Sequence, residues 1–156
     1  MAPTGILRRT DTGVDLELTR TISAPREDVW ATLTDSDRTA GWYGPWERLS
    51  ENSIHVQMLF EDGAPWMDMN IDVCESPSRL AVSTTGGWQI DVRLTGATTL
   101  TLIHHLSSTE GVGEIGPGWE YYLDMMLASR DGTPLPSFDD YYPSQKEYYS
   151  TLGVER

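Results

Sequence analysis

Residues 118–127 read GWEYYLDMML, and this stretch decides the fold. Its apolar side chains recur at three- and four-residue intervals, which places them on one face of a helix. They are Trp119, Leu123, Met126 and Leu127. Pro117 near the start and Gly132 after the end are typical of helix boundaries, so we predict a long helix over 115–130. A helix with one apolar face needs an apolar surface to cover.

The chain before this helix alternates apolar and polar residues with a period of two, which is the pattern of strands with one buried face. The first such segment is 14–22, and two short helices are expected after it, over 25–34 and 35–42. Six further strands follow, and the connections between them are short, so we expect neighbouring strands to be antiparallel. Their ranges are 48–50, 54–60, 66–74, 80–85, 88–94 and 98–106.

These segments predict an α+β helix-grip fold, in which a curved seven-stranded antiparallel sheet wraps around the long C-terminal helix and two short helices follow the first strand. We expect a flexible lead over 1–12, the helix-grip domain over 13–132, and an aromatic tail over 133–156 that packs on the same domain. A strongly bent sheet that holds one helix leaves a gap between them, where small ligands typically bind. The predicted lining is Trp42, Met67, Met69, Trp88, Leu102, His104, Trp119, Tyr122, Leu123 and Met126.

Composition narrows the range of partners. There are 24 acidic residues against 11 basic ones, and the net charge of −13 repels phosphate backbones and anionic lipid headgroups. We therefore expect neither a nucleic-acid partner nor a membrane partner. Cys74 is the single cysteine, so no internal disulfide can form, and no apolar run approaches the roughly 20 residues of a membrane span. Because residues 1–9 do not resemble a signal peptide, we predict a cytoplasmic location.

His104 is the most informative polar residue, since strand alternation places it on the same face as Leu100 and Leu102, toward the predicted gap. A neutral imidazole there could orient a bound polar group or move a proton, or it could simply bond to backbone or water. His55 and His105 are expected to point elsewhere, so we predict no metal site. The sequence contains no phosphate-binding loop and no dinucleotide fingerprint, and we expect no cofactor.

Three charged residues and an aromatic tail leave alternatives open. Glu120 and Asp124 share a helix face and are expected to be solvated. Arg20 lies on an otherwise apolar strand face, where we expect it at the margin of the sheet, with an acidic partner as the alternative. The aromatic residues over 139–149 are expected to wrap over the domain, although they could also cover the mouth of the pocket or form the contact of a homodimer.

Three segments resemble the AHSA-type family, homologues of the activator of heat-shock protein ninety ATPase, within the SRPBCC superfamily. Residues 21–34, TISAPREDVWATLT, are similar to the strand-to-helix segment I-x-A-P-x-x-x-V-W-x-x-L-T of that family. Residues 42–45, WYGP, resemble its W-(F/Y)-G-P, and residues 118–124, GWEYYLD, resemble the start of its G-W-x-x-x-L-x-x-L helix. The resemblance implies a helix-grip fold with a cavity. Members include small-molecule binders, cyclases and chaperone partners.

We therefore predict that the chain binds a small hydrophobic or aromatic molecule and is non-enzymatic or only weakly enzymatic. The resemblance adds two alternatives. One is an interaction domain for a chaperone or stress pathway, and the other is a cyclase or hydrolase that uses His104 with a tyrosine. The sequence assigns no catalytic residue.

Overall fold

The computed structural model describes residues 2–155, which form nine strands, four α-helices and one short 3-10 helix. The first half contains β1 (Ile6–Arg9), β2 (Val14–Thr21), α1 (Arg26–Thr34), α2 (Ser36–Thr39), β3 (Trp46–Ser50), β4 (Ser53–Gln57) and β5 (Trp66–Glu75). The second half contains β6 (Arg79–Thr84), β7 (Gln89–Thr95), β8 (Thr99–Leu106), α3 (Val112–Asp131), the 3-10 helix η1 (Phe138–Asp140), α4 (Lys146–Ser150) and β9 (Val154–Glu155).

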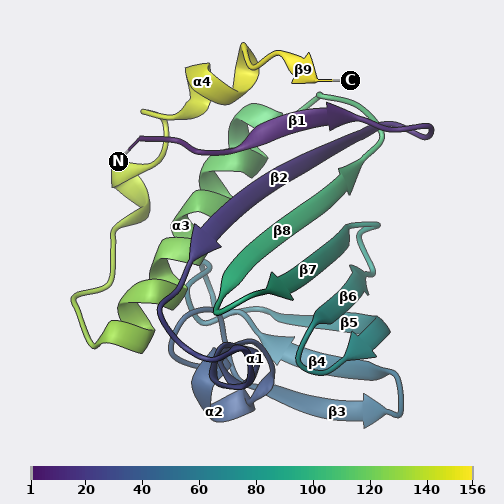
Figure 1. Cartoon of the computed structure of the whole chain (residues 1–156), viewed down its shortest axis with the longest axis vertical. Coiled ribbons are helices and arrows are strands. Elements are labelled where there is room, and N and C mark those ends of the chain that lie inside the picture. The colour runs from purple at the N-terminus through teal and green to yellow at the C-terminus, as the bar shows by residue number, and fades with distance from the viewer. Residues whose placement is uncertain (1, 156) are drawn as a thin grey trace.

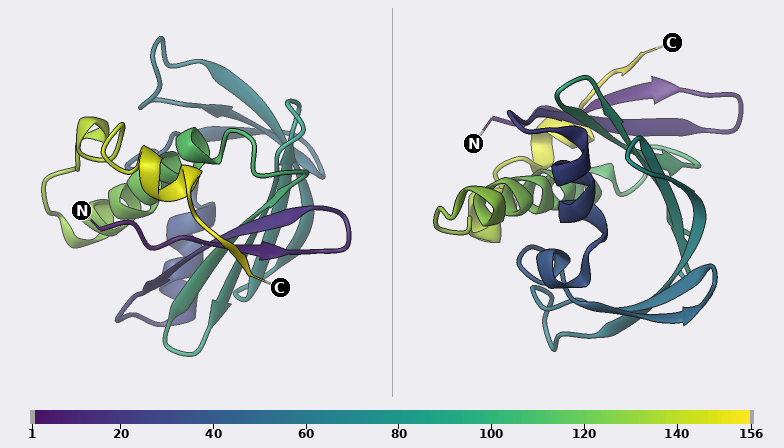
Figure 2. Two further views of the ribbon diagram at one scale, coloured as in Figure 1. Left: turned by 90° about the horizontal axis from the view of Figure 1, so that it is seen from above. Right: turned by 60° about the horizontal axis from the view of Figure 1, so that its bottom comes forward.

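The nine strands form a single sheet in the order β3-β4-β5-β6-β7-β8-β2-β1-β9 (Figure 1). Neighbouring strands are antiparallel, except that β1 and β9 run parallel at one edge. The sheet bends into an arch, and α3 lies on its concave side (Figure 2). The helices α1 and α2 connect β2 to β3, which is the edge strand at the far side of the arch.

The core lies where α3 packs on the concave face of β2, β7 and β8. Alternate residues of these strands point toward the helix, as their period-two patterns predict. The helix contributes the apolar face predicted from its spacing, together with Met125. The most deeply buried side chains of this region are Leu16, Leu18, Leu94, Leu100, Leu123, Met125 and Met126.

The α+β class, the curved sheet, the long helix and the two short helices are confirmed, but the prediction of seven strands was wrong. The two additional strands are β1, inside the predicted lead over 1–12, and β9, inside the predicted tail. Leu7 of β1 is fully buried against Leu16 of β2. β9 is only two residues long and pairs with a strand about 145 positions earlier, so no local sequence pattern predicts it. The division into lead, domain and tail stays a prediction.

The helix α3 begins at Val112, earlier than its apolar stripe indicates, and Pro117 therefore lies within it. The first turns of α3 pack against α4, and Gly116 makes this contact possible. A Cβ atom at Gly116 would lie 2.4 Å from the ring of Tyr149, so the glycine provides the space in which α4 packs on α3. Gly132 ends the helix in a left-handed conformation with φ 69°, as predicted.

Candidate functional site

His104 belongs to a row of side chains that crosses the concave face of the sheet. Strand pairing places Leu16 of β2 on one side of it and Ile90 of β7 on the other, and Val82 of β6 follows Ile90. His104 is the polar member of this apolar row and is only 1% exposed. It is buried on the same face as Leu102, in agreement with strand alternation.

The concave face is covered unevenly. Beneath α3, Leu102 is buried, and at the other flank Val56 of β4 is fully buried. That second flank is held against the segment after α2, because Gln57 donates its backbone N–H to the carbonyl oxygen of Pro45. Between the flanks, the apolar side chains on the inner face of β5 and β6 are only partly buried. They are Met67, Met69, Ile71, Leu80 and Val82. We call these five residues the inner strip.

Two tryptophans enclose His104. The indole Nε1–H of Trp119, on α3, donates a hydrogen bond of 3.0 Å to His104 Nδ1. The Trp88 ring lies 4.5 Å from the imidazole and 6.0 Å from the Trp119 ring, measured between centroids. Trp88 directly precedes β7 and keeps 42% of its surface exposed. The arrangement is an aromatic cluster with a buried imidazole at its centre and one exposed indole at its rim.

The Trp119 contact fixes the protonation of His104. Burial, with a smaller contribution from the neighbouring His105, lowers the pKa of His104 to about 4, so its imidazole is neutral at pH 7. An indole N–H can only donate, so Nδ1 must accept and the ring proton must reside on Nε2. Nε2 has no hydrogen-bond partner in residues 2–155 and is not fully closed off. His104 therefore presents one free N–H donor.

A second contact joins α3 to the loop between β4 and β5. The hydroxyl of Tyr122 donates a 2.9 Å hydrogen bond to Glu61 Oε2. Burial and the adjacent Glu61 carboxylate both raise the pKa of Tyr122 above its ordinary value, which keeps the hydroxyl protonated. Sequence reasoning predicted Tyr122 but missed Glu61, because no pattern in the turn over 61–65 indicates a partner so far along the chain.

The ten predicted lining residues fall into two groups. Four of them are buried in the hydrophobic core: Trp42, Leu102, Leu123 and Met126. The Trp42 indole donates to the carbonyl oxygen of Thr32, a contact that joins the turn after α2 to α1. Five keep part of their surface accessible: Met67, Met69, Trp88, Trp119 and Tyr122. His104 lies between the groups, and the contacts bring it together with Trp88 and Trp119. That the ten line one cavity stays a prediction.

The expectation that Glu120 is solvated was wrong, since it is 1% exposed. It forms ion pairs and hydrogen bonds across the fold, with Arg20 of β2 at 2.8 Å, the Tyr149 hydroxyl at 2.5 Å and the Thr4 hydroxyl at 2.8 Å. Burial raises the pKa of Glu120, but the hydrogen bonds from Tyr149, Thr4 and Arg20 outweigh burial and leave the pKa below its ordinary value. Arg20 also pairs with Asp124, so the alternative of an acidic partner for Arg20 is the correct one.

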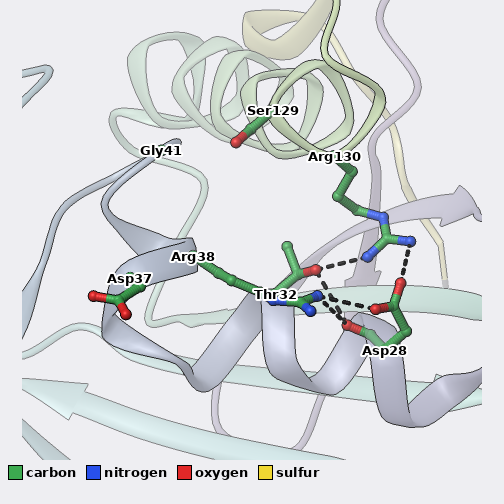
Figure 3. Close-up of a pocket in the computed structure, with 7 residues that line it drawn as sticks. All are labelled: Asp28, Thr32, Asp37, Arg38, Gly41, Ser129 and Arg130. Atoms are coloured by element: carbon green, nitrogen blue, oxygen red, sulfur yellow. Dashed lines mark hydrogen bonds and ion pairs between the residues drawn. The ribbon is translucent and has the colours of Figure 1, made fainter.

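A polar groove of about 420 Å³ lies between α1, α2 and the last turn of α3 (Figure 3). Arg38 and Arg130 approach the two oxygens of the Asp28 carboxylate at 3.0 and 2.8 Å, and Arg130 also donates to the Thr32 hydroxyl. Hydrogen bonds from Arg130 and Arg38 lower the pKa of Asp28. With Asp37 also in the lining, two guanidinium groups face two carboxylates, so the groove carries no net charge. Its contacts join the end of α3 to α1.

Two kinds of site concern residues 2–155 as a whole, a metal centre and a membrane-spanning helix. No group of three or more histidine, cysteine, aspartate or glutamate side chains is placed to hold a metal ion there. None of the helices in that range combines the length and the hydropathy that crossing a membrane requires.

The whole chain was compared with known proteins. No protein-family model matches the sequence, and none of the curated proteins matches it. Solved structures do match. CalU16 from Micromonospora echinospora is 23% identical, with a TM-score of 0.75 over 97% of this chain and 96% of its own. DynU16, from the dynemicin biosynthetic locus, is 27% identical, with a TM-score of 0.66 over 80% of this chain and 50% of its own.

A third structure carries the name of the family that the sequence resembles. The AHSA1-like protein from Aeromonas hydrophila is 16% identical, with a TM-score of 0.65 over 76% of this chain and 92% of its own. At such identities, likeness of structure establishes the fold. The resemblance predicted from three sequence segments is confirmed at the level of the fold, which this chain shares with the AHSA1-like protein and with CalU16.

Proposed function

We propose that this protein binds a small hydrophobic or aromatic molecule on the concave face of its sheet, over the inner strip and against the cluster of Trp88, His104 and Trp119. The observation that carries the proposal is the incomplete cover of that face. The apolar residues on the inner face of β5 and β6 keep accessible surface, whereas the corresponding positions of β2, β7 and β8 are buried in the core. A continuous apolar surface of this kind marks a place where another molecule binds.

The energetics favour a ligand of modest size. Each 100 Å² of apolar surface removed from water contributes about 2.5 kcal/mol. Association itself costs at least about 4 kcal/mol. A two-ring aromatic molecule that covers a few hundred Å² of its own surface and the inner strip therefore binds with a dissociation constant of roughly micromolar order.

The state of His104 favours binding over proton transfer. A general base works best when its pKa lies near the operating pH, and the pKa of His104 is about 4. The lone pair that could accept a proton is on Nδ1, where it already accepts the Trp119 N–H. Among the alternatives from the resemblance, a cyclase or hydrolase with His104 as its base is thus disfavoured by geometry.

The test is a titration with N-phenyl-1-naphthylamine, a neutral dye whose fluorescence rises in apolar surroundings. Met69→Glu places a charge in the inner strip, and the neighbouring Asn70→Glu places the same charge on the exposed outer face of β5. We expect at least a tenfold weaker affinity for Met69→Glu and less than a twofold change for Asn70→Glu. Thermal melting of both variants checks that they are folded. Equal affinities for the two variants, or no binding by the unaltered protein, would overturn the proposal.

A further inference from the structure

The free N–H of His104 bears on the chemistry of the ligand. Resting on the proposed function, we propose that the ligand is an uncharged aromatic molecule with a hydrogen-bond-accepting oxygen, such as a ketone, ester or ether, and that His104 Nε2–H binds this oxygen. Trp119 is the positioning residue, because its indole N–H holds His104 in the tautomer that donates from Nε2.

The unused hydrogen-bonding capacity of His104 indicates that the ligand carries an accepting oxygen. In residues 2–155 the imidazole makes one side-chain hydrogen bond, the one it accepts from Trp119 at Nδ1. Its second nitrogen carries a proton without a partner, although the residue is 99% buried in an apolar row. Because Nε2 is not fully closed off, a ligand oxygen can reach it, and a ligand that makes this hydrogen bond is favoured over a ligand without an acceptor.

The charged groups around His104 indicate that the ligand is uncharged. The imidazole is neutral, and its ring contacts are indoles. Arg20 lies on the same face of β2, but its guanidinium already pairs with Glu120 and Asp124. A ligand carboxylate would therefore be buried without a cation, which is costly, and the net charge of −13 adds repulsion.

The indole ring of Trp88 beside His104 indicates that the ligand is a flat aromatic molecule. Trp88 lies tilted against the imidazole at 4.5 Å between centroids and is 42% exposed, so part of its surface is accessible next to His104. Aromatic pairs gain stability in offset-stacked and edge-to-face arrangements beyond what their burial contributes. An aromatic ring on Trp88 brings a substituent oxygen within reach of Nε2.

Three naphthalenes of nearly equal size test the inference by equilibrium dialysis at pH 7: 2-acetylnaphthalene, 2-ethylnaphthalene and 2-naphthoate. We expect the acetyl compound to bind about fivefold more tightly than the ethyl compound, from one additional hydrogen bond, and 2-naphthoate to bind more weakly than both. In His104→Phe, which lacks the donor, the acetyl-to-ethyl ratio falls to about one.

A spectroscopic measurement keeps the test decisive if His104→Phe does not fold. In ¹⁵N spectra of the unaltered protein, His104 Nδ1 resonates as an unprotonated nitrogen and Nε2 as a protonated one, and 2-acetylnaphthalene, unlike 2-ethylnaphthalene, shifts the Nε2 resonance. Trp119→Phe removes the indole donor, so both tautomers appear in that variant. Conservation of the single tautomer in Trp119→Phe would refute the positioning role.

The outcomes separate this inference from the proposed function. If 2-acetylnaphthalene and 2-ethylnaphthalene bind the unaltered protein equally, the inference fails and the proposed function stands. Preference for 2-naphthoate, or an acetyl-to-ethyl ratio that persists in His104→Phe, likewise overturns the inference alone. Absence of binding by all three compounds contradicts the proposed function itself.

Discussion

The hydroxyl of Tyr122 and the carboxylate of Glu61 form a 2.9 Å hydrogen bond that joins α3 to the loop between β4 and β5. The loop is also held by the backbone N–H of Leu59, which donates to the carbonyl oxygen of Tyr43, and by the partly buried ring of Phe60. The pair thus ties the rim of the concave face to the helix that covers it.

Tyr122→Phe removes this tie without removing the ring. We expect faster amide hydrogen exchange over 58–65, measured by mass spectrometry, with a loss of at most about 1 kcal/mol in the free energy of unfolding. Tyr121→Phe is the matched control, since the Tyr121 hydroxyl makes no hydrogen bond in residues 2–155. Unchanged exchange over 58–65 in Tyr122→Phe would mean that Phe60 and the hydrogen bond from Leu59 to Tyr43 hold the loop without the Tyr122 hydroxyl.

Alanine substitutions at two glycines of α3 distinguish the effect of packing on stability from the effect of helix propensity. Gly116→Ala introduces a Cβ that would lie 2.4 Å from the Tyr149 ring, whereas a Cβ at Gly118 meets nothing within 4 Å. In urea denaturation, we expect Gly118→Ala to raise the free energy of unfolding by about 0.5 to 1 kcal/mol, the gain of alanine over glycine in a helix. Gly116→Ala lowers it by about 1 to 3 kcal/mol, because α4 must shift. Equal gains in both variants would show that α4 does not pack there.

The buried carboxylate of Glu120 should be among the most sensitive positions of the fold. Glu120→Gln leaves Arg20 with Asp124 as its single ion pair, so we expect a loss of about 2 to 3 kcal/mol in urea denaturation. Tyr149→Phe removes one hydrogen bond from the same carboxylate and costs about 1 kcal/mol. A loss in Tyr149→Phe as large as that in Glu120→Gln would indicate that the ring, and not the hydrogen bond, carries the effect.

The stability of the protein should depend on the titration of His104. Its pKa is about 4 when folded and 6.5 in the unfolded reference, so the unfolded chain binds the proton more readily. The contribution is therefore complete above pH 6.5 and is lost as the pH falls toward 4, by up to about 3 kcal/mol.

His104→Gln isolates this contribution, because glutamine does not titrate and its amide oxygen can still accept from Trp119. The measurement is the free energy of unfolding at pH 7, 6 and 5, where the carboxylates with lowered pKa values, such as Glu120 and Asp28, are still ionised. We expect the difference between the unaltered protein and His104→Gln to shrink as the pH falls. A constant difference across these pH values would contradict the lowered pKa of His104.

The sequence predicts those parts of the fold that depend on local periodicity. Strand alternation identifies β2, β7 and β8, because the apolar residues of each lie on one buried face, and helical spacing identifies the face of α3 on which Leu123 and Met126 lie. Alternation also places His104 on the buried face. These features follow from backbone geometry, which repeats every two or 3.6 residues.

The parts that the sequence did not predict depend on partners far along the chain. Glu120 is buried because Arg20 and Tyr149 converge on it, and neither lies within 25 positions of it. β9 exists because β1 lies beside it, and the tautomer of His104 depends on Trp119 in the next element. Such contacts arise from the tertiary structure, so periodicity contains no signal of them.

Because the concave face is covered unevenly, the residues that stabilise the fold differ from those that are accessible to a ligand. Side chains such as Leu16 and Leu100, which lie in the core beneath α3, stabilise the fold together with Met126 of that helix, while the inner strip on β5 and β6 contributes less to it and stays accessible. Substitutions in the strip can therefore change which molecule is bound while the core is left intact. A fold arranged in this way can acquire new ligands at little cost in stability.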